Sequence, residues 1–520
     1  MFHMPGHKLG RGFILGDTIN HEFVSLHKLG RGFMPGGAFN NPALFDVTEL
    51  DVTDDLHSPR GPLREAQELA ARAFGAGRTW FLVNGSSCGI FAMIAAVCGG
   101  DCFAGRKLLI ARDFHYSAYN AMMFARIKPI YITTQNNGAL CPESVENALI
   151  MHPDAAALFL TRPGYYGNIS NIVEIASLAR ERGIPVLVDE AHGAHFAFSG
   201  RLPVSALEGG ADICVQSAHK TLPAFTQCAY LHISERALSG IDGIEGRISE
   251  ALRAFQTSSP SFLLAASLDY AREYMAERGA AELDRVLDFC ESFYTDMGAL
   301  GYGIPADIWP APAGAGRYAR DMTRLVLDTR PLGLSGGEVE RLLWSRYKIK
   351  IEMSDPGHII MIATVADRDD DFEALSTALA EIANNRSAAT ATMTAAPTKQ
   401  GAAHDVKQNC HITSESIYPD VGMSDARMPD AEMPDAVMPL DFMSNLHAPR
   451  IFLPLETSEG RDAADIIAPY PPGIPLLCPG EKITHETIKK IQSLLQAGYI
   501  IKGINADDMT IAVHGDPTES

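Results

Sequence analysis

A lysine, an aspartate and a pair of serines stand at positions in this sequence where they could act together chemically. Lys220 follows the apolar run ICVQ in the segment ICVQSAHK, and Asp189 ends the apolar run VLVD. Ser86 and Ser87 follow the run FLVN in a turn, GSSCG, that leads into an apolar helix. A lysine can form a Schiff base, a carboxylate can hold a protonated ring nitrogen, and N–H groups at a helix start can bind phosphate. Together these functions predict a site for pyridoxal phosphate (PLP).

The elements that must position these residues alternate between strands and helices. Short apolar runs between about Arg78 and Ile233 are separated by helical patterns such as SNIVEIASLARERG. This alternation predicts an α/β fold with a mostly parallel sheet, which binds its ligands beyond the carboxyl ends of the strands. The three runs before the candidate site residues would therefore end at one edge. The runs interpreted as strands are TWFLVN, KLLIAR, PIYIT, AALFLTRP, IPVLVDE, ICVQSA and CAYLHIS.

Composition and charge restrict the partners and the compartment. The 520 residues include 43 basic and 63 acidic side chains, a net charge of −20, which argues against nucleic acid or an anionic membrane as the main partner. Nine cysteines occur without a C-x-x-C pair, which indicates a reducing compartment. The start, MFHMPGHKLG, has no signal-peptide pattern, and no apolar run approaches the ~20 residues of a membrane span. We therefore expect a cytoplasmic enzyme with no membrane partner.

Three other motifs suggest different chemistry but fit the sequence less well. GSSCG matches the G-x-S-x-G turn of a hydrolase, with Ser87 as nucleophile, but that interpretation leaves SAHK without a role. DEAH at 189–192 resembles a helicase box, yet the chain has no G-x-x-x-x-G-K-[ST] loop. His192 and His195 match no zinc motif that a third ligand completes, so no metal is predicted.

In these segments the chain resembles the Orn/Lys/Arg decarboxylases, in the shorter bacterial branch without a receiver-like N-terminal domain. This resemblance implies the PLP-dependent transferase fold (fold type I) and decarboxylation of arginine, lysine or ornithine to an amine and CO2, feeding polyamine synthesis. Two alternatives remain: another fold-type-I enzyme (an aminotransferase or lyase), or a catalytically weak homologue with a binding role. The matching segments are MPGHKLGRG, DVTELDVTDDLHSPRGPLREAQELAARAFGA, FLVNGSSCG, RDFHYSAYNAM, TRPGYYGNISNI, VLVDEAHGAHFAFS, QSAHKTLPAFTQCAYLH, TSSPSFLLAASLD and PYPPGIPLLCPGE.

The expected domain organisation combines this resemblance with local composition. The stretch after about residue 385 is rich in Ala and Thr and then repeats a proline-containing unit, MSDARMPDAEMPDAVMP, so we interpret it as a flexible linker. The predicted parts are an N-terminal segment (1–45), a PLP-binding large domain with a seven-stranded type of sheet (46–300), a small α+β domain (301–385), the low-complexity linker (386–440) and a small C-terminal α+β decarboxylase domain (441–520).

The resemblance also implies roles for individual residues. Lys220 would carry the Schiff base and Asp189 would hold the pyridine nitrogen. His115, in RDFHYS, would stack on one face of the ring and Ala191 would lie under the other, although His115 also has a plain interpretation as a buried, hydrogen-bonded histidine. His192 would lie beside the ring near the substrate carboxylate. The residues expected at the phosphate are Gly85, Ser86, Ser87, Ser217 and His219.

A second subunit is expected at the same site. Thr257 and Ser258, in TSSPS, would reach the phosphate of a neighbouring subunit, so the resemblance implies a homodimer or a higher homo-oligomer.

Substrate recognition is predicted at both ends of the chain. Tyr470 and Glu481, in PYPPGIPLLCPGE, are candidates, with a purely structural proline-rich turn as the alternative. The motif HKLGRGF occurs at 7–13 and again at 27–33, which we interpret as a local duplication with one surplus copy. His7 and Lys8 are expected to dock near an active site, and the reverse assignment of the two copies stays open.

Overall fold

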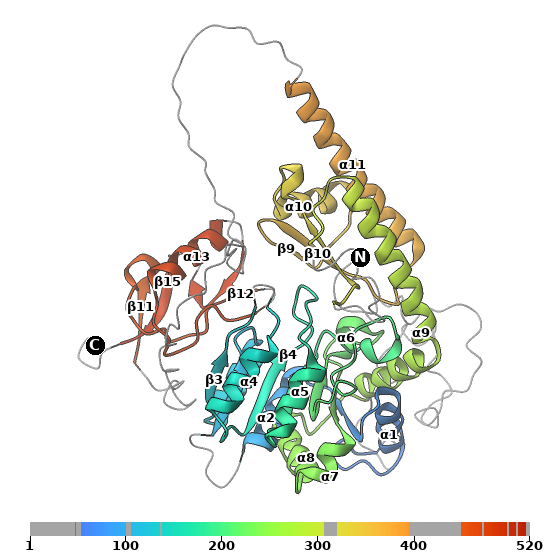
Figure 1. Cartoon of the computed structure of the whole chain (residues 1–520), viewed down its shortest axis with the longest axis vertical. Helices are drawn as coiled ribbons and strands as arrows, with labels where there is room; N and C mark the ends of the chain where they lie inside the picture. Colours follow the sequence, from blue (N-terminus) through green and yellow to red (C-terminus); the bar gives the residue numbers. More distant parts are fainter. Residues whose placement is uncertain are drawn as a thin grey trace.

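The computed structural model describes residue 47 and residues 54–99, 106–135, 138–305, 320–394, 449–470, 473–496, 499–505 and 508–515. Both HKLGRGF copies, and with them His7 and Lys8, lie outside these residues, as does 395–440 of the predicted linker. Figure 1 shows a large domain built on one sheet, a small domain that carries α10 and α11, and a C-terminal domain, coloured red, beside the large one.

The large domain is built on the predicted sheet, and all seven predicted strands form. The strand order is β1-β7-β6-β5-β4-β2-β3, with β7 antiparallel to both of its neighbours and the remaining pairs parallel. The mostly parallel α/β sheet is therefore confirmed. The strands are β1 (Arg78–Leu82), β2 (Lys107–Ala111), β3 (Lys128–Ile132), β4 (Ala157–Thr161), β5 (Val186–Asp189), β6 (Ile213–Gln216) and β7 (Ala229–Ile233).

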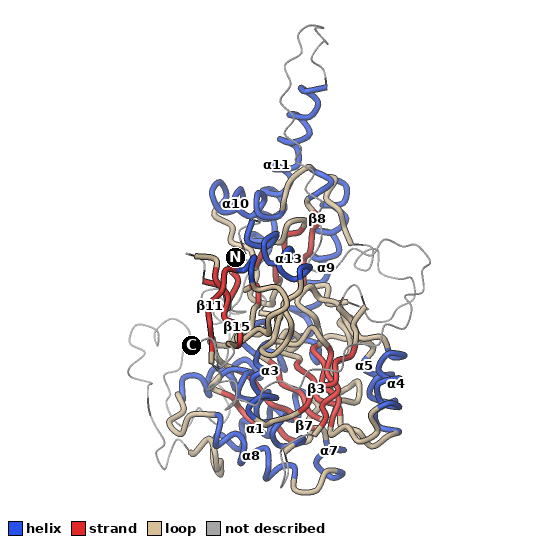
Figure 2. Tube along the Cα trace, turned by 90° about the vertical axis from the view of Figure 1, so that its left-hand side faces the viewer, coloured by secondary structure: helices blue, strands red, loops and turns tan. Residues whose placement is uncertain are grey.

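Successive side chains of each strand point to opposite faces of the sheet, and each face packs against its own layer of helices. Leu108 and Ile110 of β2 pack with α2, α3 and α8, whereas Leu109 and Ala111 pack with α4 and α5. Figure 2 shows α4 and α5 on one side of the strands and α3 and α8 on the other. The helices of this domain are α1 (Pro62–Phe74), α2 (Gly85–Cys98), α3 (Tyr116–Phe124), α4 (Pro142–Met151), α5 (Ile172–Glu181), the 3-10 helix η5 (Phe196–Phe198), α6 (Ala218–Thr221), α7 (Glu235–Gly240) and α8 (Ile244–Phe255).

The long helix α9 (Phe262–Ala299) connects the large domain to the small domain (Figure 1). One hydrophobic core runs from α1 and α9 into the small domain, so the two domains share buried side chains. The small domain has a three-stranded antiparallel sheet in the order β8-β10-β9. Its elements are β8 (Arg324–Asp328), η6 (Arg330–Leu332), α10 (Gly336–Tyr347), β9 (Met353–Ser354), β10 (His358–Ile362) and α11 (Asp369–Thr394).

The C-terminal domain has its own apolar core around α13, which includes Leu455, Ile491 and Val513. It contacts both other domains, because Tyr119 donates a hydrogen bond to the Pro479 carbonyl and Tyr499 donates one to the Ser354 carbonyl. Its elements are β11 (Arg450–Pro454), η7 (Leu455–Thr457), β12 (Ala468–Pro469), α13 (His485–Gln496), β13 (Ile501–Lys502), β14 (Ile504–Asn505) and β15 (Thr510–His514). No helix in the described ranges combines the length and apolar character that crossing a membrane requires.

Candidate active site

A cavity of about 320 Å³ lies beyond the carboxyl ends of strands β1, β2, β4, β5 and β6. This is the edge of the sheet where the sequence predicted ligand binding, because parallel strands end there together. The structure brings most of the candidate site residues into this cavity. The predicted residues that line it are Gly85, Ser86, Ser87, His115, Asp189, Ala191, His192, Ser217, His219, Lys220 and Tyr470.

Lys220 lies in the short helix α6, directly after β6, and its amine contacts a histidine. Its Nζ is 3.0 Å from Nε2 of His192, and Nδ1 of His192 accepts a hydrogen bond from Nη2 of Arg324. A guanidinium can only donate, so Nδ1 carries no proton and the neutral ring carries its proton on Nε2. That N–H points at the Lys220 amine, which can accept it only as a neutral amine. The contact therefore favours the nucleophilic form of Lys220.

The electrostatics of the cavity act in the same direction. Burial lowers the pKa of Lys220 to about 8; the Asp189 carboxylate opposes this shift and the Arg324 guanidinium adds to it. Burial also lowers the pKa of His192 well below its usual value, and the charges of Lys220 and Arg324 lower it further. His192 is therefore neutral at pH 7, as its hydrogen bonds require.

Two buried carboxyl groups face this cavity. Asp189 ends β5, and its Oδ1 accepts a hydrogen bond from the Ala191 N–H at 3.1 Å. Burial raises the pKa of Asp189, while the nearby Lys220 ammonium lowers it. Asp113 follows β2, and burial, together with the charge of Asp189, raises its pKa to about 7. Two close carboxylates disfavour each other's charge. Asp113 is therefore partly protonated near neutral pH.

The turn between β1 and α2 is where the sequence predicted a phosphate cradle. Gly85 has φ +77°, a left-handed conformation that favours glycine. A Cβ added at Gly89 would lie 2.6 Å from Cδ1 of Leu82, so the absence of a side chain lets α2 pack closely on β1. Ser86 and Ser87 stand in the first turn of α2, where backbone N–H groups have no acceptor within the helix.

His115 caps helix α3 and also lines the cavity. Its Nδ1 accepts a hydrogen bond from the Ser117 N–H at 3.3 Å and lies 2.8 Å from the Ser117 hydroxyl. Burial lowers the pKa of His115 to about 3, and the charges of Lys220 and Lys502 add to this shift. The ring is thus a neutral, fixed surface against the cavity, which agrees with both interpretations of this residue.

Buried polar atoms without partners show that the cavity fits PLP. Within the described residues, the Ser217 hydroxyl, the Thr161 hydroxyl and Oδ1 of Asp113 are buried and make no hydrogen bond, although all three residues line the cavity. Such atoms destabilise a protein unless a ligand or water satisfies them. PLP offers a phosphate, a phenolic oxygen and a ring nitrogen to these groups, and an aldehyde to Lys220.

Several predicted site residues lie outside the cavity lining. Thr257 and Ser258 are exposed in the loop between α8 and α9, and the Thr257 N–H donates to Oδ1 of Asn84 at 3.1 Å. Glu481 accepts hydrogen bonds from Arg112 at 3.0 Å and from the Cys478 N–H at 2.8 Å. Glu481 therefore joins the C-terminal domain to the large domain, and the structure does not bring it together with Lys220.

Sequence reasoning missed several residues at or near this cavity, among them Asp113, Tyr165, Arg324 and Glu352. Asp113 follows a predicted strand, as Asp189 does, so the same rule could have found it. Tyr165 lies in the quoted segment TRPGYYGNISNI after β4, and its ring centroid is 5.2 Å from that of His192. Its hydroxyl donates to Glu352, and Glu352 and Arg324 both come from the small domain. No local pattern marks these last two residues.

Comparisons with known proteins agree with this geometry. The family model described as "Orn/Lys/Arg decarboxylase, major domain" matches residues 1–309, and that of the C-terminal domain matches residues 432–502. The arginine decarboxylase of Bacillus subtilis is 33% identical and covers 96% of this chain and 92% of its own. The arginine decarboxylase of Halalkalibacterium halodurans is 32% identical, with coverage of 97% and 92%. The structure of lysine decarboxylase A from Pseudomonas aeruginosa shares the fold, with a TM-score of 0.68, 19% identity and coverage of 96% and 78%.

Proposed function

This chain belongs to the Orn/Lys/Arg decarboxylase family, and from this premise we propose that it is a PLP-dependent arginine decarboxylase. As a member of this family of carboxy-lyases, it converts a basic amino acid to the corresponding amine and CO2. Arginine is favoured because the arginine decarboxylases named above align over 92% of their own length. The Pseudomonas lysine decarboxylase LdcA is 25% identical, and the alignment covers 66% of it.

Different residues of the cavity would bind different parts of PLP. When bound, PLP supplies an aldehyde for an amine and a ring that accepts electrons from the substrate. Lys220 would provide that amine, Asp189 would hold the ring nitrogen, and His115 and Ala191 would lie on opposite faces of the ring. The phosphate would be held by Gly85, Ser86, Ser87, Ser217 and His219.

The protein's own residues prepare and direct the proton transfers. Because its pKa is lowered to about 8, Lys220 has a larger neutral fraction near pH 7 than an ordinary lysine, and this fraction can form a bond at Nζ without first losing a proton. His192 holds its proton on Nε2 and donates this N–H to the Lys220 nitrogen, and so orients the amine. Arg324 acts as a positioning residue, because it fixes the proton on Nε2 by donating to Nδ1. The proton that replaces the carboxylate would come from the ammonium form of Lys220, which a pKa of about 8 keeps populated near pH 7.

The C-terminal domain contributes an aromatic surface for a cationic substrate. Tyr470 lines the cavity, and the Lys502 ammonium lies 3.7 Å from the centroid of its ring. Because Lys502 occupies one face of the ring, a guanidinium would contact the opposite face or the edge of Tyr470. We infer that Tyr470, rather than Glu481, contacts the substrate side chain.

A homo-oligomer belongs to the same proposal. The exposed Thr257 and Ser258 would reach the PLP phosphate of a second copy, so each site would be completed by its neighbour. The product amine would enter polyamine synthesis in the cytoplasm.

The observation that carries the proposal is the buried Lys220 amine beside Asp189 and His192. The test incubates the purified, PLP-loaded protein with arginine, lysine and ornithine in turn and measures CO2 and amine. We expect kcat/KM to be highest with arginine. A keto-acid product would indicate an aminotransferase instead, and a bound cofactor without any product would indicate a binding role.

A further inference from the structure

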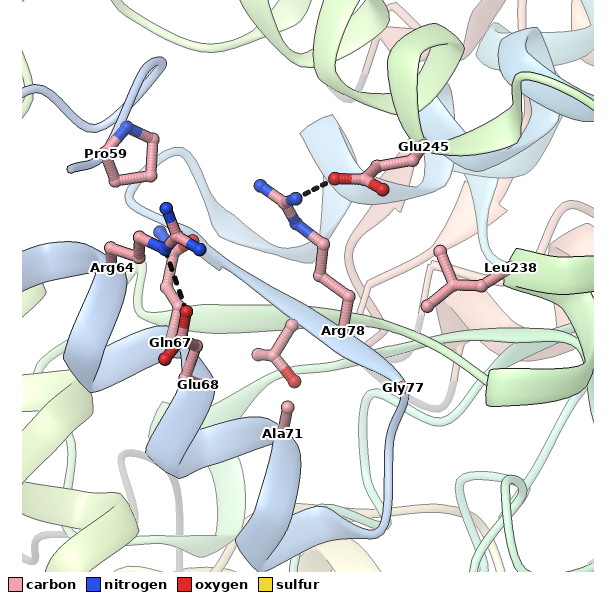
Figure 3. Close-up of a pocket in the computed structure, with 10 residues that line it drawn as sticks. Pro59, Arg64, Gln67, Glu68, Ala71, Gly77, Arg78, Leu238 and Glu245 are labelled. Atoms are coloured by element: carbon pink, nitrogen blue, oxygen red, sulfur yellow. Dashed lines mark hydrogen bonds and ion pairs between the residues drawn. The ribbon is translucent and has the colours of Figure 1, made fainter.

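A second cavity, of about 520 Å³, lies in the large domain and shares no lining residue with the PLP cavity. Figure 3 shows its residues: Arg64 and Gln67 come from α1, Arg78 from β1, and Glu245 from α8 on the opposite side. The cavity is thus bounded by α1, β1, α7 and α8, with Leu238 as the residue from α7.

Two arginine–glutamate ion pairs line this cavity. Nε of Arg64 bonds to Glu68 at 2.8 Å, and Nη1 of Arg78 bonds to Glu245 (Figure 3). Each ion pair uses one nitrogen of its guanidinium, and each guanidinium has five N–H groups. The other guanidinium nitrogens have no hydrogen-bond partner within the described residues. Arg64 and Arg78 therefore both present unused N–H groups to the cavity.

Gln67 provides an independent observation at the same place. Its side chain is 4% exposed and lines the cavity, yet its Nε2 has no hydrogen-bond partner within the described residues. A buried amide N–H₂ without an acceptor destabilises the fold, so a ligand that supplies the acceptor would be favoured.

The charges of the lining balance, because Arg64 and Arg78 are paired with Glu68 and Glu245, so the attraction for an anion comes from the unused guanidinium donors. Burial lowers the pKa of Arg78 and the charge of Arg64 lowers it further, whereas the Glu68 carboxylate opposes this shift. An anion could contact both guanidinium groups, which bind phosphate and carboxylate oxygens in a bidentate manner.

We propose that the cavity between α1, β1 and α8 binds the phosphate or carboxylate group of a small anionic ligand through Arg64, Gln67 and Arg78. This site is separate from the PLP cavity, and its occupation does not depend on the decarboxylation reaction.

The experiment uses full-length protein saturated with PLP, so that the cofactor's own phosphate cradle is filled. Isothermal titration with inorganic phosphate and, separately, with succinate measures whether either oxyanion binds. We expect saturable binding of at least one of them, and the preferred probe identifies the class of ligand. Absence of saturable binding for both would overturn the proposal.

Three variants locate the binding. Arg64→Gln removes one exposed guanidinium whose pair with Glu68 contributes little to stability, and it should weaken binding about 10-fold. Gln67→Glu keeps the side-chain size but replaces the donor with a carboxylate, and it should weaken binding at least as much. Arg182→Gln, which removes an arginine paired with Glu146 elsewhere in the domain, should leave binding unchanged. Equal binding by all the variants would refute the site.

Discussion

The Lys220 amine lies 3.0 Å from Nε2 of His192, and this contact determines which proton each group holds. Because Arg324 donates to Nδ1 of the same ring, His192 presents an N–H to Lys220, and Lys220 accepts it when its amine is neutral. Arg324 of the small domain therefore influences the protonation state of Lys220 through the imidazole of His192. Its consequences can be measured one at a time.

PLP uptake should depend on pH through Lys220. Burial lowers the pKa of its amine to about 8, so the neutral form increases as pH rises and predominates above that value. The rate of PLP uptake by the apoprotein should therefore rise with pH, with a midpoint near pH 8, and level off about one pH unit above it. Stopped-flow absorbance across this range gives the midpoint. A midpoint near 10.5, the usual value for a lysine, would contradict the prediction.

Arg324→Met should shift that midpoint to higher pH. The substitution removes a buried positive charge that lowers the pKa of Lys220, and it frees Nδ1 of His192 to carry the proton. Nε2 could then accept from the Lys220 ammonium, which stabilises the charged form, and kcat should fall about 10-fold or more. Arg330→Met, at an exposed arginine of the same domain, is the control and should change neither quantity. An unchanged midpoint in Arg324→Met would remove the assigned role of Arg324.

Asp189→Asn should lower kcat much more than Asp113→Asn, although both carboxyl groups line the same cavity. Asp189 would supply the charge that holds the ring nitrogen of PLP protonated, so its loss should lower kcat by roughly 10²–10³-fold. Asp113 already carries a proton part of the time near neutral pH, because its pKa is about 7, and an amide there should cost less than about 10-fold. Steady-state kinetics at saturating PLP makes the comparison. Equal losses would mean that the two roles are assigned wrongly.

Removing one partner of a buried ion pair near the site should strongly destabilise the protein. Arg162 and Glu190 are almost completely buried, and Nη1 of Arg162 lies 3.1 Å from Oε1 of Glu190. Glu190→Ala would leave the guanidinium uncompensated and should lower the free energy of unfolding by about 3–5 kcal/mol. Urea denaturation measures this, with Glu68→Ala, in an exposed pair, as the control that should change little. A small effect of Glu190→Ala would show that water or another group reaches Arg162.

The seven strands and the residues at their ends were predictable, and the contributions of other domains were not. A strand buried on both faces is a short apolar run, and parallel strands end at one edge, so Asp189 and Lys220 could be placed together from the sequence alone. Arg324 and Glu352 reach the site only through the packing of the small domain, more than a hundred residues further along the chain than His192. Glu481 has the chemistry of a substrate ligand, but the fold places it against Arg112, and no local pattern indicates that contact.

The central claim is that Lys220 is the residue that binds PLP covalently. Purified protein loaded with PLP and then treated with borohydride would fix an imine as a stable secondary amine, and peptide mass spectrometry would locate it. The account predicts one modified peptide, carrying the adduct on Lys220, and no adduct in Lys220→Ala. An adduct on a different lysine, or none in the wild-type protein, would contradict it.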